Sequence, residues 1–188
     1  MSRTCWSCDE EVGASLVCNA CHKLQPPLDL NPFDRFEIPS HPSVDQGNLR
    51  KKYLEMQATF HPDRFVSKTK EEQLYAHQQS EAFNNAFVVL RDPTKCLESL
   101  LKGEKLPPDD PETLMEVMDL YDQIDSLSDK DDLCALEQKT SEKRALVLGI
   151  CIKAFEETNK KILLQDFKKL QFFEKILITL KEKIHRLS

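Results

Sequence analysis

The residues best suited to chemistry in this chain are four cysteines near its amino terminus, arranged as two C-x-x-C pairs. Cys5 and Cys8 form the first pair, and Cys18 and Cys21 form the second. A C-x-x-C turn presents two sulfurs on one tight bend, and thiolates are preferred ligands of structural Zn²⁺. A segment too short to bury a core would gain most of its folding free energy from such a metal. The spacing therefore predicts one structural zinc ion held by these four residues.

Three other kinds of chemistry remain open for these cysteines. The run Cys18-Asn19-Ala20-Cys21-His22 matches the attachment pattern of c-type haem, although it leaves the first pair without a role. Redox chemistry at the first pair would require a preceding strand and a following helix, which the segment lacks. Iron in a four-cysteine site is the third alternative. We interpret His22 as a bystander, because four sulfurs already satisfy the metal.

A second group with chemical potential is the tripeptide His61-Pro62-Asp63. Apolar residues recur at helical spacing before it, over residues 48–60, and after it, over residues 71–90. Pro62 cannot continue the first helix, because it lacks an N–H and disfavours α geometry in the residue before it. The pattern predicts a helical hairpin with an imidazole and a carboxylate exposed at its bend. An enzyme using His61 and Asp63 as an acid–base pair would need a concave pocket with oxyanion donors, which such a bend does not offer.

The composition indicates a helical protein with few or no strands. The chain has 188 residues, of which 40% are apolar and 31% charged, and only four are glycine. No apolar run is long enough to cross a bilayer. The net charge of −6 disfavours general nucleic-acid binding, so a zinc-dependent nucleic-acid binder is the weaker hypothesis. The charge is uneven, because basic side chains gather in residues 45–70 and acidic side chains in residues 109–132.

Two proline pairs, Pro26-Pro27 and Pro107-Pro108, divide the chain into three expected domains. A zinc-binding extension covers residues 1–30, a four-helix segment covers 31–106, and a bundle of three antiparallel helices covers 107–188. Asp45 is the expected N-cap of the second helix, and Gly103 is expected to close the fourth. The helices are expected, in chain order, at about residues 34–38, 48–60, 71–90, 94–102, 111–126, 133–156 and 160–185. The predicted fold class is all-α.

The first and last helices of the third domain carry more apolar residues than one buried stripe requires. Phe172 and Ile176 fall beside the core stripe of the last helix, and Met115 and Met118 fall beside that of the first. A broad core face and an exposed patch built for a partner both fit this surplus. The expected core stripes are Leu163, Phe167, Leu170, Phe173, Leu177, Leu180 and Ile184 in the last helix, and Leu114, Val117, Tyr121 and Ile124 in the first. The remaining cysteines, Cys96, Cys134 and Cys151, are interpreted as small buried hydrophobes.

The His61-Pro62-Asp63 tripeptide between two helices resembles the J domain of DnaJ-type co-chaperones. Four sequence features extend the resemblance to the HscB family, the J-domain co-chaperones of iron–sulfur cluster biogenesis. They are HPDRF at residues 61–65, FNNAFVVLRDP at 83–93, LMEVMDLYDQID at 114–125 and KLQFFEKI at 169–176. The paired C-x-x-C motifs, beginning Cys-Trp-x-Cys, resemble the zinc-binding extension of many eukaryotic members.

The resemblance implies two working surfaces and no catalytic residue. His61, Pro62 and Asp63, with the basic residues Arg50, Lys51 and Lys52, would engage a DnaK-type heat-shock chaperone and trigger its ATP hydrolysis. The iron–sulfur cluster scaffold protein would bind a patch that maps to Leu114, Met115, Met118, Asp119, Asp122 and Phe172. The family has an acidic residue where Ser126 stands, which implies a weaker rim there. The chain would act as a non-enzymatic co-chaperone that delivers the scaffold and promotes cluster transfer to apo-proteins.

The resemblance also implies a place of action. Family members mostly work in the mitochondrial matrix or in bacterial cytoplasm, so we expect a mitochondrion or a mitochondrion-related organelle. No presequence is visible in residues 1–15, and a cytosolic protein is the alternative. Neither a nucleic acid nor a membrane is an expected partner. A monomer and a weak dimer are both compatible with the sequence.

Overall fold

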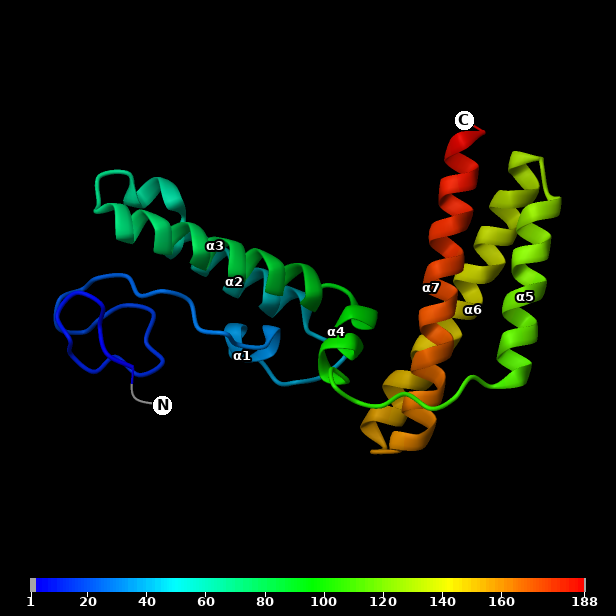
Figure 1. Ribbon diagram of the computed structural model, residues 1–188, viewed down its shortest axis with the longest axis horizontal. Helices are drawn as coiled ribbons and strands as arrows, with labels where there is room; N and C mark the ends of the chain where they lie inside the picture. The colour runs from blue at the N-terminus through cyan, green and yellow to red at the C-terminus, as the bar shows by residue number, and fades with distance from the viewer. Residues whose placement is uncertain (1–2, 188) are drawn as a thin grey trace. The chain divides into compact units, whose positions relative to one another are not determined.

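The structure is a computed structural model that describes residues 3–187, and it divides into two compact units (Figure 1). Unit 1 is Met1–Leu100 and unit 2 is Leu101–Ser188. Over the described residues all regular elements are helices, and the only β contacts are the isolated bridges Thr4–Glu11 and Val17–Leu24. The predicted all-α fold class is confirmed. No helix in the described part is long and apolar enough to cross a membrane.

Unit 1 begins with a cysteine ribbon, the name used here for residues 3–25, followed by four α-helices and one 3-10 helix. The ribbon consists of two tight turns, each closed by one isolated β-bridge. The helical elements that follow are α1 (Pro32–Phe36), α2 (Gln46–Phe60), η1 (Pro62–Phe65), α3 (Lys70–Leu90) and α4 (Pro93–Leu100). Asp45 caps α2 as expected, since its side chain accepts from the N–H groups of Gly47 and Asn48.

The short helices depart from the sequence prediction because single residues decide where they end. Asn31 caps α1 and Glu37 adopts a left-handed conformation with φ of 49°, so the helix covers 32–36 instead of 34–38. Ile38 lies after the helix but still packs on the core of unit 1. The fourth helix ends at Leu100, and Gly103, with φ of 89°, follows it in a turn.

The core of unit 1 lies between α1, α2 and α3 and is rich in aromatic side chains. Phe36 meets Phe83 edge-on with ring centroids 5.4 Å apart, and the Phe60 ring is parallel to that of Phe83 with centroids 6.0 Å apart. Such ring pairs add to the burial energy that holds the α2–α3 hairpin on α1. Leu24 of the ribbon is fully enclosed in this same core, so the ribbon packs as part of unit 1.

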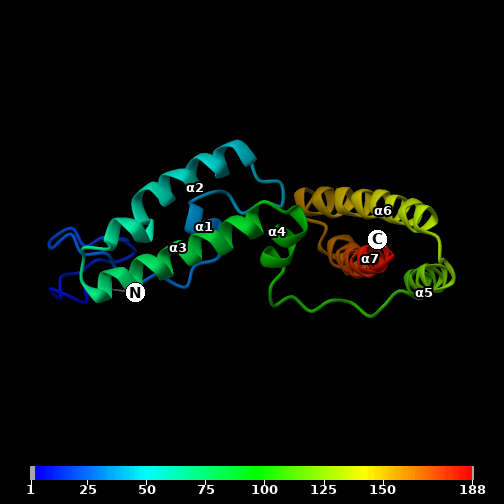
Figure 2. The same ribbon diagram turned by 90° about the horizontal axis from the view of Figure 1, so that it is seen from above.

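Unit 2 is a bundle of three helices, α5 (Pro111–Ser126), α6 (Lys130–Glu156) and α7 (Lys160–Arg186). Figure 2 looks nearly along α5 and α7, with α6 seen along its length beside them. Thr158, in a left-handed conformation with φ of 56°, lies in the tight turn that makes α6 and α7 an antiparallel hairpin. The α7 stripe predicted from Leu163 to Leu180 is buried, and Ile184 at its end is half-buried. The three predicted helices of this segment are confirmed to within three residues at each end.

The buried face of α5 differs from the predicted one. The structure buries Val117, Leu120 and Ile124 together with Thr113, and it exposes Leu114 and Tyr121. The expected core stripe was therefore rotated by part of a turn, because a surplus of apolar residues fits more than one stripe. Ile176 of α7 is fully buried instead of lying beside the core.

Candidate functional site

The four cysteines of the ribbon come together as one cluster, called here the four-cysteine cluster (Cys5, Cys8, Cys18 and Cys21). Their sulfur atoms all lie within 4.8 Å of one another, and none of them forms a disulfide. The Sγ atoms of Cys5 and Cys21 are 3.6 Å apart, and those of Cys8 and Cys18 are 3.7 Å apart. A tetrahedron with Zn–S bonds of about 2.3 Å has edges of about 3.8 Å. The cluster is therefore of the right size to hold one tetrahedral metal ion.

The surroundings of the cluster favour the thiolate form of Cys5. Burial by itself would raise the pKa of the Cys5 thiol, but hydrogen bonds from the N–H groups of Ser7 and Cys8 and from the Cys21 and Gln25 side chains outweigh it, and the pKa falls to about 6. The Glu10 N–H favours the Cys8 thiolate, but the neighbouring sulfurs and burial prevail and raise the pKa of Cys8 to about 12. Four thiolates at this spacing repel one another, so a cation is needed to balance them. This chemistry fits a divalent metal ion.

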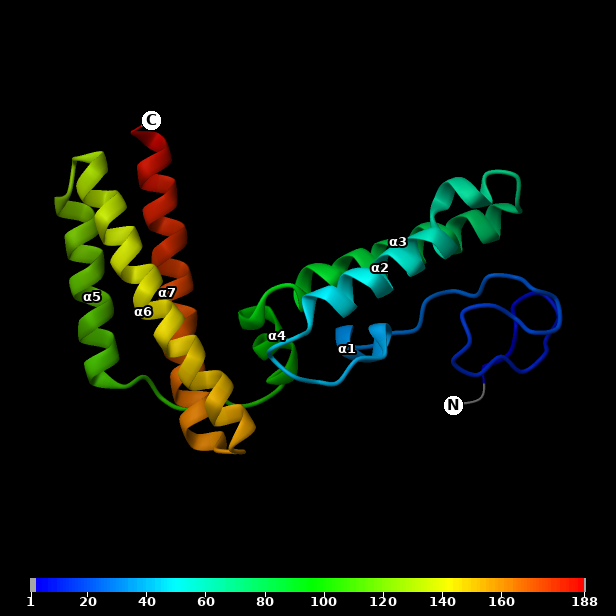
Figure 3. The ribbon, with the colours of Figure 1, turned by 180° about the vertical axis from the view of Figure 1, so that it is seen from behind.

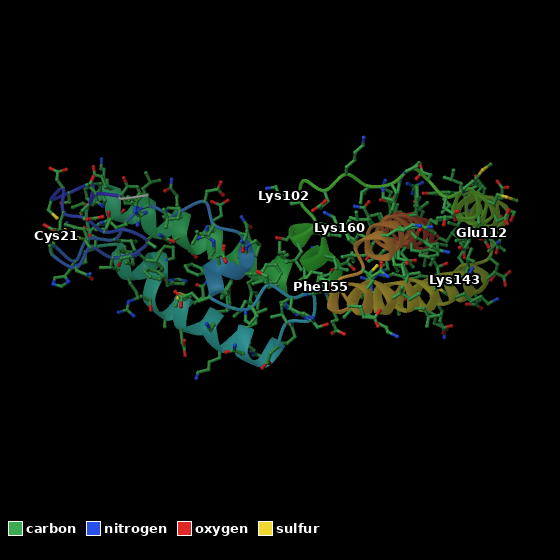
Figure 4. The ribbon with its side chains drawn as sticks, turned by 90° about the horizontal axis from the view of Figure 1, so that it is seen from below. Cys21, Lys102, Glu112, Lys143, Phe155 and Lys160 are labelled. Carbon is green, nitrogen blue, oxygen red and sulfur yellow. The ribbon has the colours of Figure 1, made fainter. Side chains whose placement is uncertain are left out.

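Residues around the cluster support its shape and do not add a ligand. His22 is exposed, with φ of 58°, and lies outside the group of residues whose ligand atoms converge. Gln25 is completely buried, and its Nε2 donates to the Sγ of Cys5 at 3.3 Å. Figure 4 labels Cys21 at the amino-terminal end of unit 1. Sequence reasoning did not single out Gln25, since its role depends on the fold of the ribbon.

The tripeptide His61-Pro62-Asp63 forms the corner between α2 and α3. The His61 N–H donates to the Gln57 carbonyl and ends α2, and Pro62 starts η1. The Asp63 N–H donates to Nδ1 of His61 at 3.3 Å, which leaves Nε2 of the neutral imidazole as the N–H donor. The His61 and Asp63 side chains are 51% and 87% exposed. The backbone is thus held by local hydrogen bonds, while both functional groups face solvent.

The three basic residues of α2 differ in their surroundings. Arg50 and Lys51 are exposed. The Nζ of Lys52 instead donates to the carbonyls of Phe36 and Glu37, at 2.8 and 3.0 Å, where α1 ends. A cation at these last carbonyls stabilises the helix terminus, so Lys52 has a structural role that its sequence position did not indicate.

Arg50 also borders a groove of about 960 Å³ on the α2–α3 hairpin. The rings of Tyr53 and Phe87 stack at 4.0 Å on its wall, and the Arg91 guanidinium lies over Phe87. Phe87 and Arg91 belong to the run at residues 83–93 that carries part of the family resemblance. Their place beside Arg50 was not deduced from the sequence, because it requires the pairing of α2 with α3.

The predicted scaffold-binding residues of unit 2 occupy an exposed surface of α5 and α7. Met115 and Met118 are 68% and 65% exposed, and Leu114 is 38% exposed. Asp119 and Asp122 are exposed on the same helix, and Phe172 is half-buried on α7 with the Lys175 ammonium 6.0 Å from its ring. We call the set Leu114, Met115, Met118, Asp119, Asp122 and Phe172 the α5–α7 patch.

Ion pairs hold the helices that carry this patch. Lys169 of α7 pairs with Glu116 of α5 at 2.8 Å, and Lys168 pairs with Asp109 just before α5 at 2.8 Å. The Lys183 ammonium donates to the carbonyl of Ile124 at the other end of α5. Tyr121 adds a further exposed ring to α5 that sequence reasoning had assigned to the core. The exposed apolar side chains of α5 therefore lie on a helix that is fixed to α7 at both ends.

Comparison with known proteins places this geometry in a family. Residues 109–181 match the model of the HSCB C-terminal oligomerisation domain. A co-chaperone protein HscB homolog of Mannheimia succiniciproducens is 31% identical over 128 residues, which is 60% of this chain and 74% of the relative. The chain belongs to the HscB family. An iron–sulfur cluster co-chaperone protein HscB homolog of Arabidopsis thaliana is 28% identical over 178 residues, covering 91% of this chain and 70% of the relative.

The HscB fold extends over nearly the whole chain. Human co-chaperone HscB superposes with a TM-score of 0.86 over 96% of this chain and 98% of the human chain, at 23% identity. For some bacterial HscB homologs, the sequence match covers only 64% of the length of the relative. The HscB relatives are named co-chaperones, a class of protein that is not enzymatic. The predicted family is confirmed, whereas the roles of individual residues stay predictions.

Proposed function

We propose that this chain stimulates the ATPase of a DnaK-type heat-shock chaperone and delivers an iron–sulfur cluster scaffold protein to it. The observation that carries the proposal is the corner at residues 61–63, where a fixed backbone presents an exposed imidazole and an exposed carboxylate. The name of the Arabidopsis thaliana relative supports the connection to iron–sulfur clusters. The proposed division of labour is metal binding by residues 1–30, chaperone stimulation by 31–106 and scaffold binding by 107–188.

The corner would act by binding, because no bond is broken at it. The Asp63 carboxylate accepts hydrogen bonds only and would pair with an arginine or with backbone N–H groups of the chaperone. The His61 Nε2–H would donate to the same partner while its Nδ1 stays engaged with the Asp63 N–H. Arg50 and Lys51 would steer the approach of an acidic surface, and Lys52 would contribute less, since its ammonium already caps α1.

The α5–α7 patch would hold the scaffold. Its methionines adapt to irregular partner surfaces, and exposed apolar side chains rimmed by acids are typical of a binding site. When the scaffold and the corner are presented by one chain, hydrolysis in the chaperone can tighten its grip on the scaffold and favour handover of the cluster. The chain would also be non-enzymatic.

The four-cysteine cluster would hold one zinc ion with all four sulfurs. Bound zinc supplies a structural cross-link between the two turns of the ribbon. Gln25 would orient the Cys5 sulfur by its hydrogen bond, and the N–H of Ser7 donates to the same sulfur. We further propose a mitochondrion or mitochondrion-related organelle as the place of action, with the cytosol as the alternative.

Steady-state ATPase of a DnaK-type chaperone, with and without the scaffold, tests the proposal. The chain should stimulate hydrolysis most when the scaffold is present, and His61→Gln should remove the stimulation. His77→Gln is the matched control, because His77 is an exposed histidine on α3 outside the corner. Stimulation that ignores the scaffold would refute the delivery role, and full stimulation by His61→Gln would refute the role of the corner.

A further inference from the structure

The cysteine ribbon contacts the first three turns of α3, the helix that follows the corner at residues 61–63. Figures 1 and 3 both show the amino-terminal loops beside the end of the hairpin where α2 passes into α3. We propose that the metal-bound ribbon holds in order the first turns of α3, the helix that follows this corner, and that Lys23 and Gln25 are the positioning residues that connect the two. The proposal rests on metal binding by the four-cysteine cluster, as put forward above.

The first connection is a partly buried ion pair at the start of α3. The Lys23 Nζ lies 2.8 Å from Oε2 of Glu72, whose side chain is only 5% exposed. The same Oε2 accepts from the N–H and the hydroxyl of Thr69, and the Glu72 N–H donates to the Thr69 hydroxyl at 3.3 Å. These reciprocal bonds are a capping box, which starts the helix that follows the corner.

Lys23 stabilises this capping box by balancing the buried charge of Glu72. A buried carboxylate without a cation is unfavourable, and the cation here comes from a residue 49 positions away in the chain. Burial by itself would raise the pKa of Glu72, but the Lys23 ammonium and the Thr69 hydrogen bonds prevail and keep it below its usual range. Without Lys23 the buried charge of Glu72 has no cation to balance it, which weakens the capping box and lets the first turn of α3 fray.

The second connection runs through two buried amides. The Gln25 side chain donates to the Cys5 Sγ at 3.3 Å and to the Lys23 carbonyl at 2.9 Å. The Gln79 side chain, from α3, donates to the Gln25 backbone carbonyl at 3.1 Å. Gln25 and Gln79 are both completely buried. One short path therefore leads from a metal ligand, through the backbone at 23–25, to the third turn of α3.

The ribbon depends on its metal for the shape that makes these connections. Its own buried cluster contains only Cys5, Val12 and Cys18, with Cys21 packed against it. Leu24, with Leu16 and Val17, packs on the core of unit 1, but so small a cluster around the sulfurs is not enough to fix the two turns, and metal binding supplies most of the free energy that does so. Loss of the metal would release residues 23–25 from α3, and the capping box at Thr69 and Glu72 would loosen with them.

Trp6 provides a built-in reporter of docking. Its ring meets Tyr75 of α3 edge-on at 5.6 Å, and its Nε1 donates to the Leu24 carbonyl at 2.8 Å. It is the one tryptophan in the sequence, so the intrinsic tryptophan emission of the full chain comes from the interface between ribbon and α3. Undocking would expose the indole and shift its emission to longer wavelength.

The test measures amide hydrogen exchange and Trp6 emission of the full chain, with the bound metal counted in each sample. Removing the metal with a chelator should shift the emission and raise exchange in residues 66–73. The variant Lys23→Met should raise exchange there roughly fivefold, which corresponds to the loss of a typical helix cap, while one metal ion stays bound. Lys160→Met is the matched control, because it breaks an exposed ion pair with Glu104 in unit 2 and should leave residues 66–73 unchanged.

A double-variant cycle separates the ion pair from general damage. Glu72→Gln keeps a side chain that can complete the capping box but removes the buried charge, so Lys23→Met should have little further effect in that background. Unchanged exchange at 66–73 in Lys23→Met, or after verified metal removal, would overturn the inference. A chain that binds no metal would overturn the metal proposal and this inference together, whereas bound metal with unchanged exchange would overturn this inference alone.

Discussion

Truncating the two exposed methionines of α5 should weaken scaffold binding and leave the fold intact. Complete burial of a methionine side chain is worth about 1.5–3 kcal/mol. Met115 is 68% exposed and Met118 is 65% exposed, so a partner that covers them can bury about two-thirds of each side chain. The gain is then about 1–2 kcal/mol for each residue. Met115→Ala and Met118→Ala should each raise the dissociation constant by about 5- to 30-fold.

Calorimetry with the purified scaffold measures the loss of scaffold affinity, and denaturant unfolding of the same samples measures stability. Stability should change by less than about 0.5 kcal/mol, since both side chains are already in water. Leu146→Ala is the matched control, because Leu146 of α6 is 71% exposed but lies outside the α5–α7 patch. Leu120→Ala, on the buried face of α5, should instead lose about 2–5 kcal/mol of stability. The reasoning would be refuted if Leu146→Ala weakened scaffold binding as much as the methionine variants do, or if neither methionine variant weakened it.

Further expected outcomes concern acid, thiols and metal. Burial by itself would raise the pKa of Glu116, but Lys143 and Lys169 outweigh burial and lower it. The ionised carboxylate therefore adds to the free energy of unfolding above the unfolded-state pKa, and this stabilisation is lost as the pH falls through the lower folded-state pKa. Glu116→Gln should therefore flatten the loss of stability between neutral and acid pH in denaturant titrations. In native protein, iodoacetamide should modify the exposed Cys134 before Cys96 and Cys151, because burial raises the pKa of these two to about 11 and 12; mass spectrometry of the peptides would show the order. Co²⁺ should bind the four-cysteine cluster with the absorption of a tetrahedral thiolate site, and a spectrum without thiolate bands would contradict four-sulfur ligation.

The long helices could be predicted because their evidence is local. Apolar spacing, the cap at Asp45 and the prolines at 62 and 111 act within a few residues of the backbone that they shape. The same locality explains the prediction that His61 and Asp63 lie exposed at a bend. The two C-x-x-C pairs predicted a metal-compatible cluster because each turn positions its own sulfurs.

Buried faces were harder to predict where apolar residues were in excess. Leu114 and Tyr121 fit a helical stripe as well as Leu120 does, and the packing of α5 on α7 decides which of these side chains is buried. Cys134 was expected to be buried and is exposed, because the first turns of α6 present that side to solvent. Side-chain type sets which residues can be buried, but the neighbouring helix sets which of them are.

Other outcomes depended on residues far apart in the chain. Lys52 looked like part of a basic binding face, yet its ammonium caps α1 sixteen residues earlier. Lys23 meets Glu72 only after the ribbon docks on α3, and nothing in either local sequence indicates that meeting. The sequence by itself determined the long helices, the exposed corner and the two sulfurs of each C-x-x-C turn, because each depends on the geometry of a few neighbouring residues. Tertiary structure decided which apolar stripe is buried, which cations are engaged and how the ribbon contacts α3, because those depend on contacts that form only when distant segments pack together.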